Sequence, residues 1–215
     1  VDRREFVLEI VLIVVGIGPG SADYILPEAL RAIETATFLV GGARALTAYA
    51  KPDQQQVKVD ADIAGLLQTI RQELALRDVT VMVSGDPGYY SLLETFRREL
   101  PQARIRVIPG ISSFQLAFAR IGLPWQTARL LSAHGRKPSP AALVREPGMP
   151  LSFLTDARQH PAVIAGWLQE QGWPPTARVW LCKNLSYPDE TVAGMTLAEA
   201  LEVSGFESCV MVVME

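Results

Sequence analysis

Apolar residues in the first half of the chain gather in short runs, each followed by a glycine, a serine or a proline. Largely apolar runs occupy residues 10–15, 37–40, 79–83 and 105–108. Runs without regular polar alternation are typical of parallel strands that are covered on both faces. We therefore predict four strands of a parallel sheet in this half of the chain.

Between these runs, apolar residues recur three and four positions apart. This spacing predicts helices over residues 27–36, 63–76, 92–100 and 114–121. Strands that alternate with helices predict an α/β fold with right-handed crossovers. In such folds the ligand binds just outside the carboxyl ends of the strands. The loops at those ends are therefore the first candidates for a functional site.

The alternation breaks at residues 122–125, where the sequence reads Gly-Leu-Pro-Trp. We place a boundary there between an N-terminal α/β domain, residues 1–121, and a C-terminal α/β domain, residues 122–215. The second domain is predicted to hold a helix and four strands. Residues 135–150 are rich in glycine and proline, which indicates a partly irregular or mobile stretch. The predicted helix covers residues 161–171, and the strands cover residues 130–132, 151–154, 179–181 and 210–213.

Composition narrows the class of protein. The 215 residues are 49% apolar and carry a formal net charge of -3, so a sizeable core is expected and no general basic surface for nucleic acid. No apolar run near the start approaches the roughly 20 residues of a membrane helix. The first nine residues mix charged and apolar positions, unlike a secretory signal, so we expect a cytoplasmic protein without a membrane partner.

The metal-binding residue types are sparse. Cys182 and Cys209 lack the spacing of a metal site, so we expect reduced thiols. The chain has two histidines, His134 and His160, and neither has a cysteine or carboxylate at ligand spacing. No metal site is predicted.

Three glycine-rich segments follow predicted strands. We call them the first, second and third glycine loops: residues 16–20, 84–88 and 109–113. Glycine has no Cβ, so such loops let the backbone approach a ligand closely, although a tight turn alone would also explain the first. The first loop is not a dinucleotide fingerprint, because Ser21 replaces its third glycine and Pro19 lacks an N–H. A nucleotide-dependent oxidoreductase is therefore disfavoured.

Polar residues in the second and third glycine loops have two interpretations each. Asp86 either organises its turn or accepts hydrogen bonds from a hydroxyl or amine of a ligand. Ser112 and Ser113 precede an apolar helical stretch, so one of them is expected to cap the helix. Capping is compatible with ligand contact, because a helix start presents free N–H groups.

Taken in order, the three glycine loops resemble the signatures of the tetrapyrrole (corrin/porphyrin) methylases. The resemblance extends over residues 10–215. Residues 41–44, 122–125 and 134–136 resemble one branch, the cobalt-precorrin-7 C(5)-methyltransferases and the matching domain of precorrin-6Y C(5,15)-methyltransferases. Two positions depart from the pattern: Ser91 stands where the branch commonly has glycine, and Lys183 where the family often has an acidic residue.

This resemblance implies an α/β fold of two domains, with the active site in the cleft between them. The implied activity is the S-adenosylmethionine-dependent methylation of a tetrapyrrole, cobalt-precorrin-7 at carbon 5, in cobalamin biosynthesis. A homodimer is implied, with a separate decarboxylating C15 methylase as functional partner. The residues implied to bind the donor are Pro19, Ser84, Gly85, Asp86, Tyr89, Ser112, Ser113, Leu154, Asn184 and Leu185.

The substrate carries acetate and propionate groups, which arginine binds well because its planar fork reaches both oxygens. Arg44 and Arg136 are the first candidates for this role, followed by Lys137 and Arg120. A solvated surface charge is the alternative for each. His134 is the candidate catalytic residue for managing a proton during methyl transfer.

Two other readings stay open. A methylase of the same fold could act on another tetrapyrrole position, on an RNA ribose or on a diphthine precursor. A non-catalytic carrier would hold the tetrapyrrole or the donor without turnover.

Overall fold

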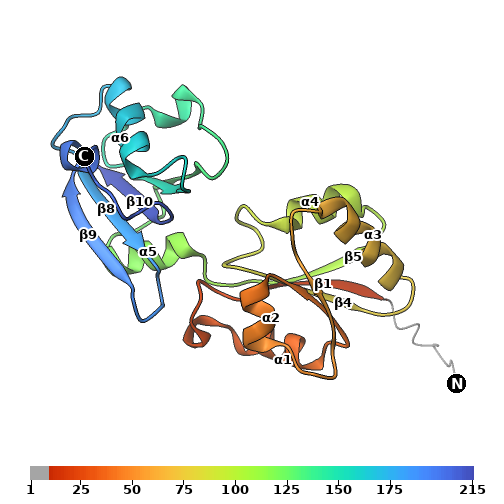
Figure 1. Ribbon diagram of the computed structural model, residues 1–215. Helices are drawn as coiled ribbons and strands as arrows, with labels where there is room; N and C mark the ends of the chain where they lie inside the picture. Colours follow the sequence, from red (N-terminus) through yellow and green to blue (C-terminus); the bar gives the residue numbers. More distant parts are fainter. Residues whose placement is uncertain (1–9) are drawn as a thin grey trace, which may run out of the picture. The chain divides into compact units, whose positions relative to one another are not determined.

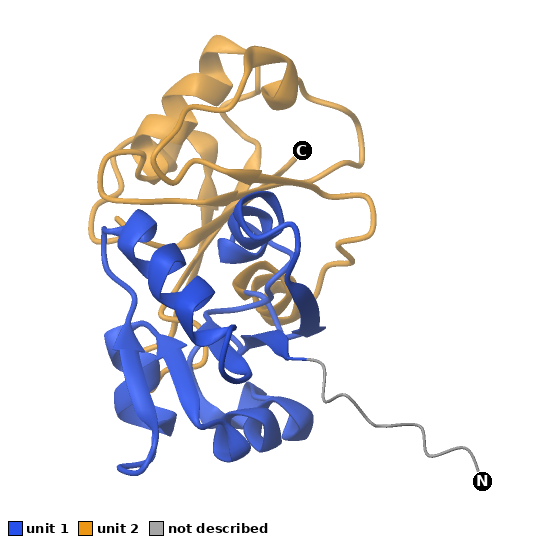
Figure 2. Cartoon of the chain, turned by 90° about the vertical axis from the view of Figure 1, so that its right-hand side faces the viewer, with its two compact units in different colours: residues 1–112 blue, residues 113–215 orange. Residues whose placement is uncertain are grey.

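The computed structural model describes residues 10–215. The first nine residues, on which part of the expected location rests, lie outside the described residues. The chain forms two compact units that divide between Ser112 and Ser113 (Figure 2). Each unit contains one five-stranded sheet with helices packed on it, so the predicted α/β class is confirmed.

The sheet of the first unit is entirely parallel, as predicted. Its order is β3-β2-β4-β1-β5, so β4 is central and β1 pairs with both β4 and β5. The carboxyl ends of all five strands therefore meet at one edge of the sheet. The strands are β1 (Val11–Gly16), β2 (Phe38–Gly41), β3 (Gln55–Lys58), β4 (Val79–Val83) and β5 (Arg104–Ile108).

Helices cover both faces of this sheet, because successive side chains along a strand point to opposite faces. Leu12 and Val14 pack with α3 (Ile63–Glu73) and α4 (Leu92–Glu99). Val15 packs on the other face with α1 (Pro27–Thr35) and α2 (Ala43–Tyr49). Figure 1 shows these two helical layers on either side of β1 and β4. A short 3-10 helix, η1 (Ala22–Tyr24), precedes α1.

The second sheet is mixed. β6 and β7 are parallel, β10 runs antiparallel between β7 and β8, and β8 forms an antiparallel pair with β9. The carboxyl ends of β6, β7 and β8 therefore lie at one edge, beside the start of β10. The strands are β6 (Arg129–Ser132), β7 (Leu151–Leu154), β8 (Arg178–Lys183), β9 (Thr191–Thr196) and β10 (Val210–Met214).

One large apolar cluster fills the second unit. It joins one face of the sheet to α6 (Pro161–Glu170) and α7 (Leu197–Ala200), and it includes the buried Trp167 and Trp173. α5 (Ser113–Ile121) packs against β10. The 3-10 helix η2 (Pro140–Leu143) adds the buried Leu143, whose carbonyl accepts a hydrogen bond from the Trp173 indole.

The boundary between the units differs from the predicted one. The prediction ended the first domain at residue 121, whereas α5 belongs to the second unit. The physical reason is the packing of α5 on β10, with Phe114, Leu116 and Phe118 buried. The break at residues 122–125 is therefore a turn inside the second unit.

The stretch over residues 135–150 is partly irregular, as predicted. It is nevertheless tied to the sheet, because Arg129 of β6 donates to the carbonyls of Ala142 and Val144 and pairs with Glu146.

Candidate functional site

The first and second glycine loops are joined directly at the carboxyl edge of the first sheet. Gly18 N–H donates to the Gly85 carbonyl at 3.3 Å, and Gly85 N–H donates to the Gly18 carbonyl at 2.8 Å. Both glycines have positive φ, 76° for Gly18 and 68° for Gly85, a backbone region that favours glycine. These two hydrogen bonds therefore form a small extension of the sheet beyond the ends of β1 and β4.

The third glycine loop packs against this junction without room for a side chain. A Cβ on Gly110 would lie 2.3 Å from the Gly85 carbonyl oxygen. A Cβ on Gly16 would lie 2.6 Å from the Gly110 nitrogen and 2.7 Å from the same oxygen. Only glycine fits at these two positions, so the three loops form one interlocked backbone surface.

Asp86 fixes the second loop to the third. Its Oδ1 accepts a hydrogen bond from Gly88 N–H at 2.7 Å, and its Oδ2 accepts one from Gly110 N–H at 3.0 Å. The side chain is half-buried. Each carboxylate oxygen has a further lone pair, so this structural role leaves capacity for a ligand donor.

The end of the second loop is held in an unusual backbone conformation. Tyr90 has a φ of 47°, and its ring meets the ring of Tyr89 edge-to-face with centroids 4.9 Å apart. Ser91 donates to the Pro87 carbonyl at 2.6 Å and accepts from Leu93 N–H as the N-cap of α4. The serine at this branch position therefore organises the loop. Burial and the neighbouring Tyr90 raise the pKa of the Tyr89 phenol, which stays protonated at neutral pH.

The remaining predicted donor residues of this unit lie on the same three loops. Pro19 is half-buried, Ser84 is exposed, and Ser112 is buried at the end of the third loop. Ser113 is the first residue of α5 and belongs to the second unit. Arg44 is exposed in the first turn of α2, which follows β2 at the same edge of the sheet.

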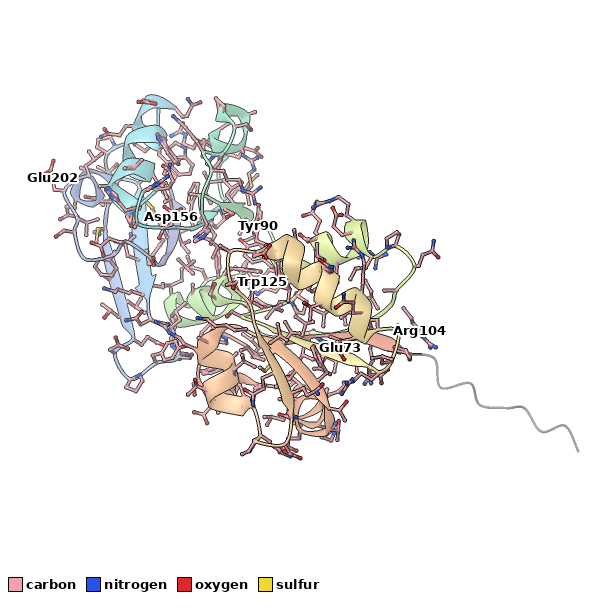
Figure 3. The ribbon with its side chains drawn as sticks, turned by 45° about the vertical axis from the view of Figure 1, so that its right-hand side comes forward. Glu73, Tyr90, Arg104, Trp125, Asp156 and Glu202 are labelled. Atoms are coloured by element: carbon pink, nitrogen blue, oxygen red, sulfur yellow. The ribbon has the colours of Figure 1, made fainter. Side chains whose placement is uncertain are left out.

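In the second unit, Asp156 organises the edge where β6 and β7 end. Its Oδ2 accepts from Gly135 N–H at 2.6 Å, and its Oδ1 accepts from the N–H groups of Arg158 and Gln159 at 2.8 and 2.7 Å. These backbone hydrogen bonds, that of Gln159 first, hold the pKa of Asp156 below its ordinary value. Asp156 is labelled in Figure 3.

His134 stands on the loop that Asp156 holds. Its Nδ1 lies 4.0 Å from Asp156 Oδ2, and 74% of its side chain is exposed. Leu154, a predicted donor contact, is the last residue of β7 and half-buried. The structure thus brings His134 and Leu154 to one edge of the second sheet.

Three basic residues of the second unit were predicted to bind substrate carboxylates. Arg136 and Lys137 are exposed, and Lys137 Nζ lies 4.9 Å from the centroid of the Trp167 ring, a cation–π arrangement. Arg120 forms an ion pair with Glu190, with 2.5 Å between Nε and Oε1. Its guanidinium is therefore already committed to a carboxylate of the protein.

Asn184 and Leu185 begin the loop over residues 184–190, between β8 and β9. Asn184 has a φ of 51° and donates from its side chain to Asp189 Oδ2 at 2.6 Å. Leu185 is buried. Because β8 ends at the same sheet edge as β6 and β7, this loop lies on the edge that carries His134 and Leu154.

Sequence reasoning missed Asp156 and Thr155. Thr155 and Cys209 exchange hydrogen bonds that tie the end of β7 to the start of β10. The signal for Asp156 was an acidic residue shortly beyond an apolar run: Asp156 follows Leu154 by two positions, much as Asp86 follows Val83 by three. The two cysteines are free thiols, as expected, and burial raises the pKa of Cys182 to about 12 and that of Cys209 to about 11.

A family model named "Tetrapyrrole (Corrin/Porphyrin) Methylases" matches residues 11–201, which span all three glycine loops and both sheets up to α7. The chain belongs to the tetrapyrrole methylases. The resemblance read from the loops is therefore confirmed.

Among curated relatives, this tetrapyrrole methylase is 35% identical over 163 residues to the cobalt-precorrin-7 C(5)-methyltransferase of Salmonella typhimurium, covering 75% of this chain and 79% of the relative. It is 26% identical over 198 residues to the probable cobalt-precorrin-7 C(5)-methyltransferase of Methanocaldococcus jannaschii, covering 86% and 89%. It is also 33% identical to the precorrin-6Y C(5,15)-methyltransferase [decarboxylating] of Sinorhizobium sp, covering 75% of this chain and 39% of that relative.

Solved structures share the fold. The uroporphyrin-III C-methyl transferase from Thermus thermophilus complexed with S-adenyl homocysteine gives a TM-score of 0.79 at 23% identity, covering 95% of this chain and 92% of that one. The precorrin-6Y methylase from Archaeoglobus fulgidus gives 0.74 at 22% identity, covering 95% and 97%.

Two features are absent from residues 10–215. Within that range, no helix has the length and apolarity to cross a bilayer. Nor does the same range contain a group of three or more His, Cys, Asp or Glu residues placed to hold a metal ion.

Proposed function

We propose that this tetrapyrrole methylase transfers a methyl group from S-adenosylmethionine to carbon 5 of cobalt-precorrin-7 in cobalamin biosynthesis. The observation that carries the proposal is the 35% identity over 75% of the chain to a relative of that name. The predicted branch motifs agree with it, since residues 41–44 and 134–136 lie at the carboxyl ends of β2 and β6.

The glycine loops of the first unit fit a donor that presses against backbone. Gly16 and Gly110 have no room for a Cβ because the loops pack backbone against backbone there, and Ser84 is exposed on the second of these loops. Asp86 retains lone pairs for a hydroxyl or amine. Pro19, Gly85, Tyr89 and Ser112 complete the proposed donor contacts of this unit.

In the second unit, Ser113, Leu154, Asn184 and Leu185 are the proposed donor contacts. Arg136 and Lys137 are proposed to bind substrate carboxylates, with Arg44 doing so from the first unit. All three side chains are exposed. The participation of residues from both units stays a prediction.

When bound, the donor supplies an electrophilic methyl group attached to a sulfonium. The protein's contribution is then mainly to align this group with the nucleophilic ring carbon and to exclude water. Orientation alone can lower a barrier by roughly 7–11 kcal/mol. His134 is proposed to hold or accept a proton, and its Nδ1 lies 4.0 Å from the Asp156 carboxylate.

A cytoplasmic homodimer is proposed for the assembly and location. The functional partner is proposed to be a decarboxylating C15 methylase, since the name of the Sinorhizobium relative joins C5 and C15 methylation with decarboxylation. Sedimentation equilibrium of the full chain tests the dimer: a monomer at micromolar concentration contradicts it.

The proposed function is tested by binding and then by turnover. Isothermal titration with S-adenosylhomocysteine is expected to give micromolar affinity. Incubation with S-adenosylmethionine and cobalt-precorrin-7 is expected to give a product heavier by one methyl group, placed at carbon 5 by NMR.

Two other outcomes identify the alternatives. Methylation of uroporphyrinogen III, or of another corrin position, would support a sister methylase. Donor and corrin binding without transfer would support the non-catalytic carrier.

A further inference from the structure

The ion pair between Arg120 and Glu190 joins two segments that lie 70 positions apart in the sequence. Arg120 lies in the last turn of α5, and Glu190 directly precedes β9. Arg120 Nε lies 2.5 Å from Glu190 Oε1, and Arg120 Nη2 lies 3.3 Å from Oε2. The side chains are 34% and 21% exposed, which makes this a two-point, half-buried pair rather than a solvated surface contact.

Glu190 also holds the loop over residues 184–190. Its Oε2 accepts a hydrogen bond from Ser186 N–H at 2.6 Å. Within the same loop, Tyr187 N–H donates to the Asn184 carbonyl at 3.0 Å, and Glu190 N–H donates to the Tyr187 carbonyl at 3.0 Å. One carboxylate thus connects the middle of the loop to α5.

This loop needs such support, because two of its residues occupy the left-handed backbone region. The φ values are 51° for Asn184 and 72° for Ser186. Residues other than glycine persist there only where surrounding contacts define the conformation. The hydrogen bond from Asn184 to Asp189 and the one from Ser186 to Glu190 are those contacts.

The charge state of Glu190 supports this arrangement. The hydrogen bond from Arg120 is the largest cause that holds the pKa of Glu190 below its ordinary value. The hydrogen bond from Ser186 N–H is the next cause that lowers this pKa. Glu190 therefore stays ionised at neutral pH and accepts both hydrogen bonds.

We infer that the Arg120–Glu190 pair is a positioning device for donor binding: it sets the conformation in which Asn184 and Leu185 meet the methyl donor. This inference rests on the proposed function. It also reassigns Arg120, which was predicted to bind a substrate carboxylate. A lysine would serve less well at this position, because its single ammonium cannot reproduce the two-point contact.

The test compares Arg120→Gln and Glu190→Gln with a matched control, Arg145→Gln. Arg145 pairs with Glu215 at 2.6 Å on the surface of the same unit, where both side chains are about 40% exposed. The measurements are the Kd for S-adenosylhomocysteine, the KM for each substrate, and amide hydrogen exchange over residues 184–190.

Both pair variants are expected to weaken donor binding about tenfold and to raise the donor KM similarly, since coupled charged neighbours commonly contribute this much. The corrin KM is expected to stay within twofold of wild type, and exchange over residues 184–190 to rise in both. The double variant is expected to be no worse than either single one, and Arg145→Gln to match wild type.

The opposite pattern of KM changes overturns the inference. If Arg120→Gln raises the corrin KM while Glu190→Gln changes neither KM, Arg120 binds substrate instead. Wild-type protein that binds donor normally, with both variants unchanged, would refute the positioning role but leave the proposed function intact. Wild-type protein that binds no donor would refute both.

Two further variants separate an effect on donor binding from a loss of folding. Arg120→Lys keeps the charge without the fork and is expected to give an intermediate donor Kd. The charge reversal Arg120→Glu with Glu190→Arg is expected to recover part of the lost affinity relative to either reversed single variant. Failure of both, at wild-type Tm, would overturn the inference.

Discussion

The carboxylate of Asp86 accepts a hydrogen bond from the backbone N–H of Gly110, 24 positions further along the chain. The same carboxylate accepts from Gly88 N–H within its own loop. Asp86 therefore fixes the backbone surface proposed to receive the donor, and is also the residue of that surface best suited to bind a donor hydroxyl or amine. The two interpretations made from sequence are compatible in the structure.

Substitutions of Asp86 test these two roles separately, through the free energy of unfolding and through donor affinity. Asp86→Ala removes both hydrogen bonds and is expected to lower the free energy of unfolding by about 2 kcal/mol. Asp86→Asn keeps one acceptor oxygen, so a loss of about half that size is expected. Both are expected to abolish binding of S-adenosylhomocysteine, which urea unfolding and isothermal titration would check. Wild-type affinity in Asp86→Asn would contradict a direct donor contact.

The interlocked glycines give a steric prediction. Gly110→Ala would place a Cβ 2.3 Å from the Gly85 carbonyl oxygen, so it is expected to destabilise the protein by about 3 kcal/mol and to weaken donor binding. Gly166→Ala in α6 is the matched control, because its Cβ would meet nothing within 4 Å. The control is expected to stabilise the helix by up to about 1 kcal/mol. Equal Tm values for the two variants would contradict the steric argument.

The strands with mostly buried residues were predicted from the sequence, whereas one edge strand of each sheet was missed. β1 and β4 are recognisable because nearly every residue faces the core. β3 was missed, since three of its four residues are exposed and its order comes from pairing with β2 alone. β9 was missed for a similar reason: it is an edge strand that contains Gly194. The short helix α2 was also not predicted.

For the candidate site, local motifs were predictable and long-range pairings were not. The glycine loops carry their geometry in consecutive residues, so their convergence followed from parallel topology. The partnership of Arg120 with Glu190 depends on α5 packing beside β10, which no local pattern encodes. The same holds for Asp156, whose acceptance of the Gly135 N–H depends on the β6–β7 register.

Asp156 predicts a pH dependence of stability. Its pKa is lowered in the folded state, so its contribution is present above the unfolded value of about 3.9 and is lost as the pH falls through the folded pKa. Asp156→Asn is expected to be less stable than wild type at pH 7, and the gap should close towards pH 3. Urea unfolding across this range measures it, with Glu202→Gln, at an exposed carboxylate, as the control for the loss of one charge. A gap that does not change with pH would contradict the assignment.

Arg136 gives a prediction about substrate affinity. Arg136→Ala is expected to raise the corrin KM about tenfold, as the loss of one charge-assisted contact would, while the donor Kd stays constant. Arg158→Ala is the control, because it removes another exposed arginine from the adjacent loop. Initial rates at varied corrin concentration provide the measurement. An unchanged KM in Arg136→Ala would assign this arginine to the solvated surface.

His134 provides the most direct test of the chemistry, because its only predicted role is with the proton. His134→Gln keeps a polar side chain but cannot change charge, so kcat is expected to fall about a hundredfold, the lower range for general acid–base catalysis. The donor Kd and both KM values are expected to stay close to wild type, since the side chain is largely exposed and is not a proposed contact.

His160→Gln is the matched control for His134→Gln. His160 is the N-cap residue of α6 without a side-chain capping bond, and it has no proposed role. The His160→Gln variant should therefore leave kcat unchanged. The pH dependence of kcat decides between two explanations of a slow His134→Gln variant. If one ionisation disappears from the profile, His134 moves the proton. If kcat falls with the profile intact, the residue only shapes its loop, and a kcat equal to wild type would show that the proton leaves to water without it.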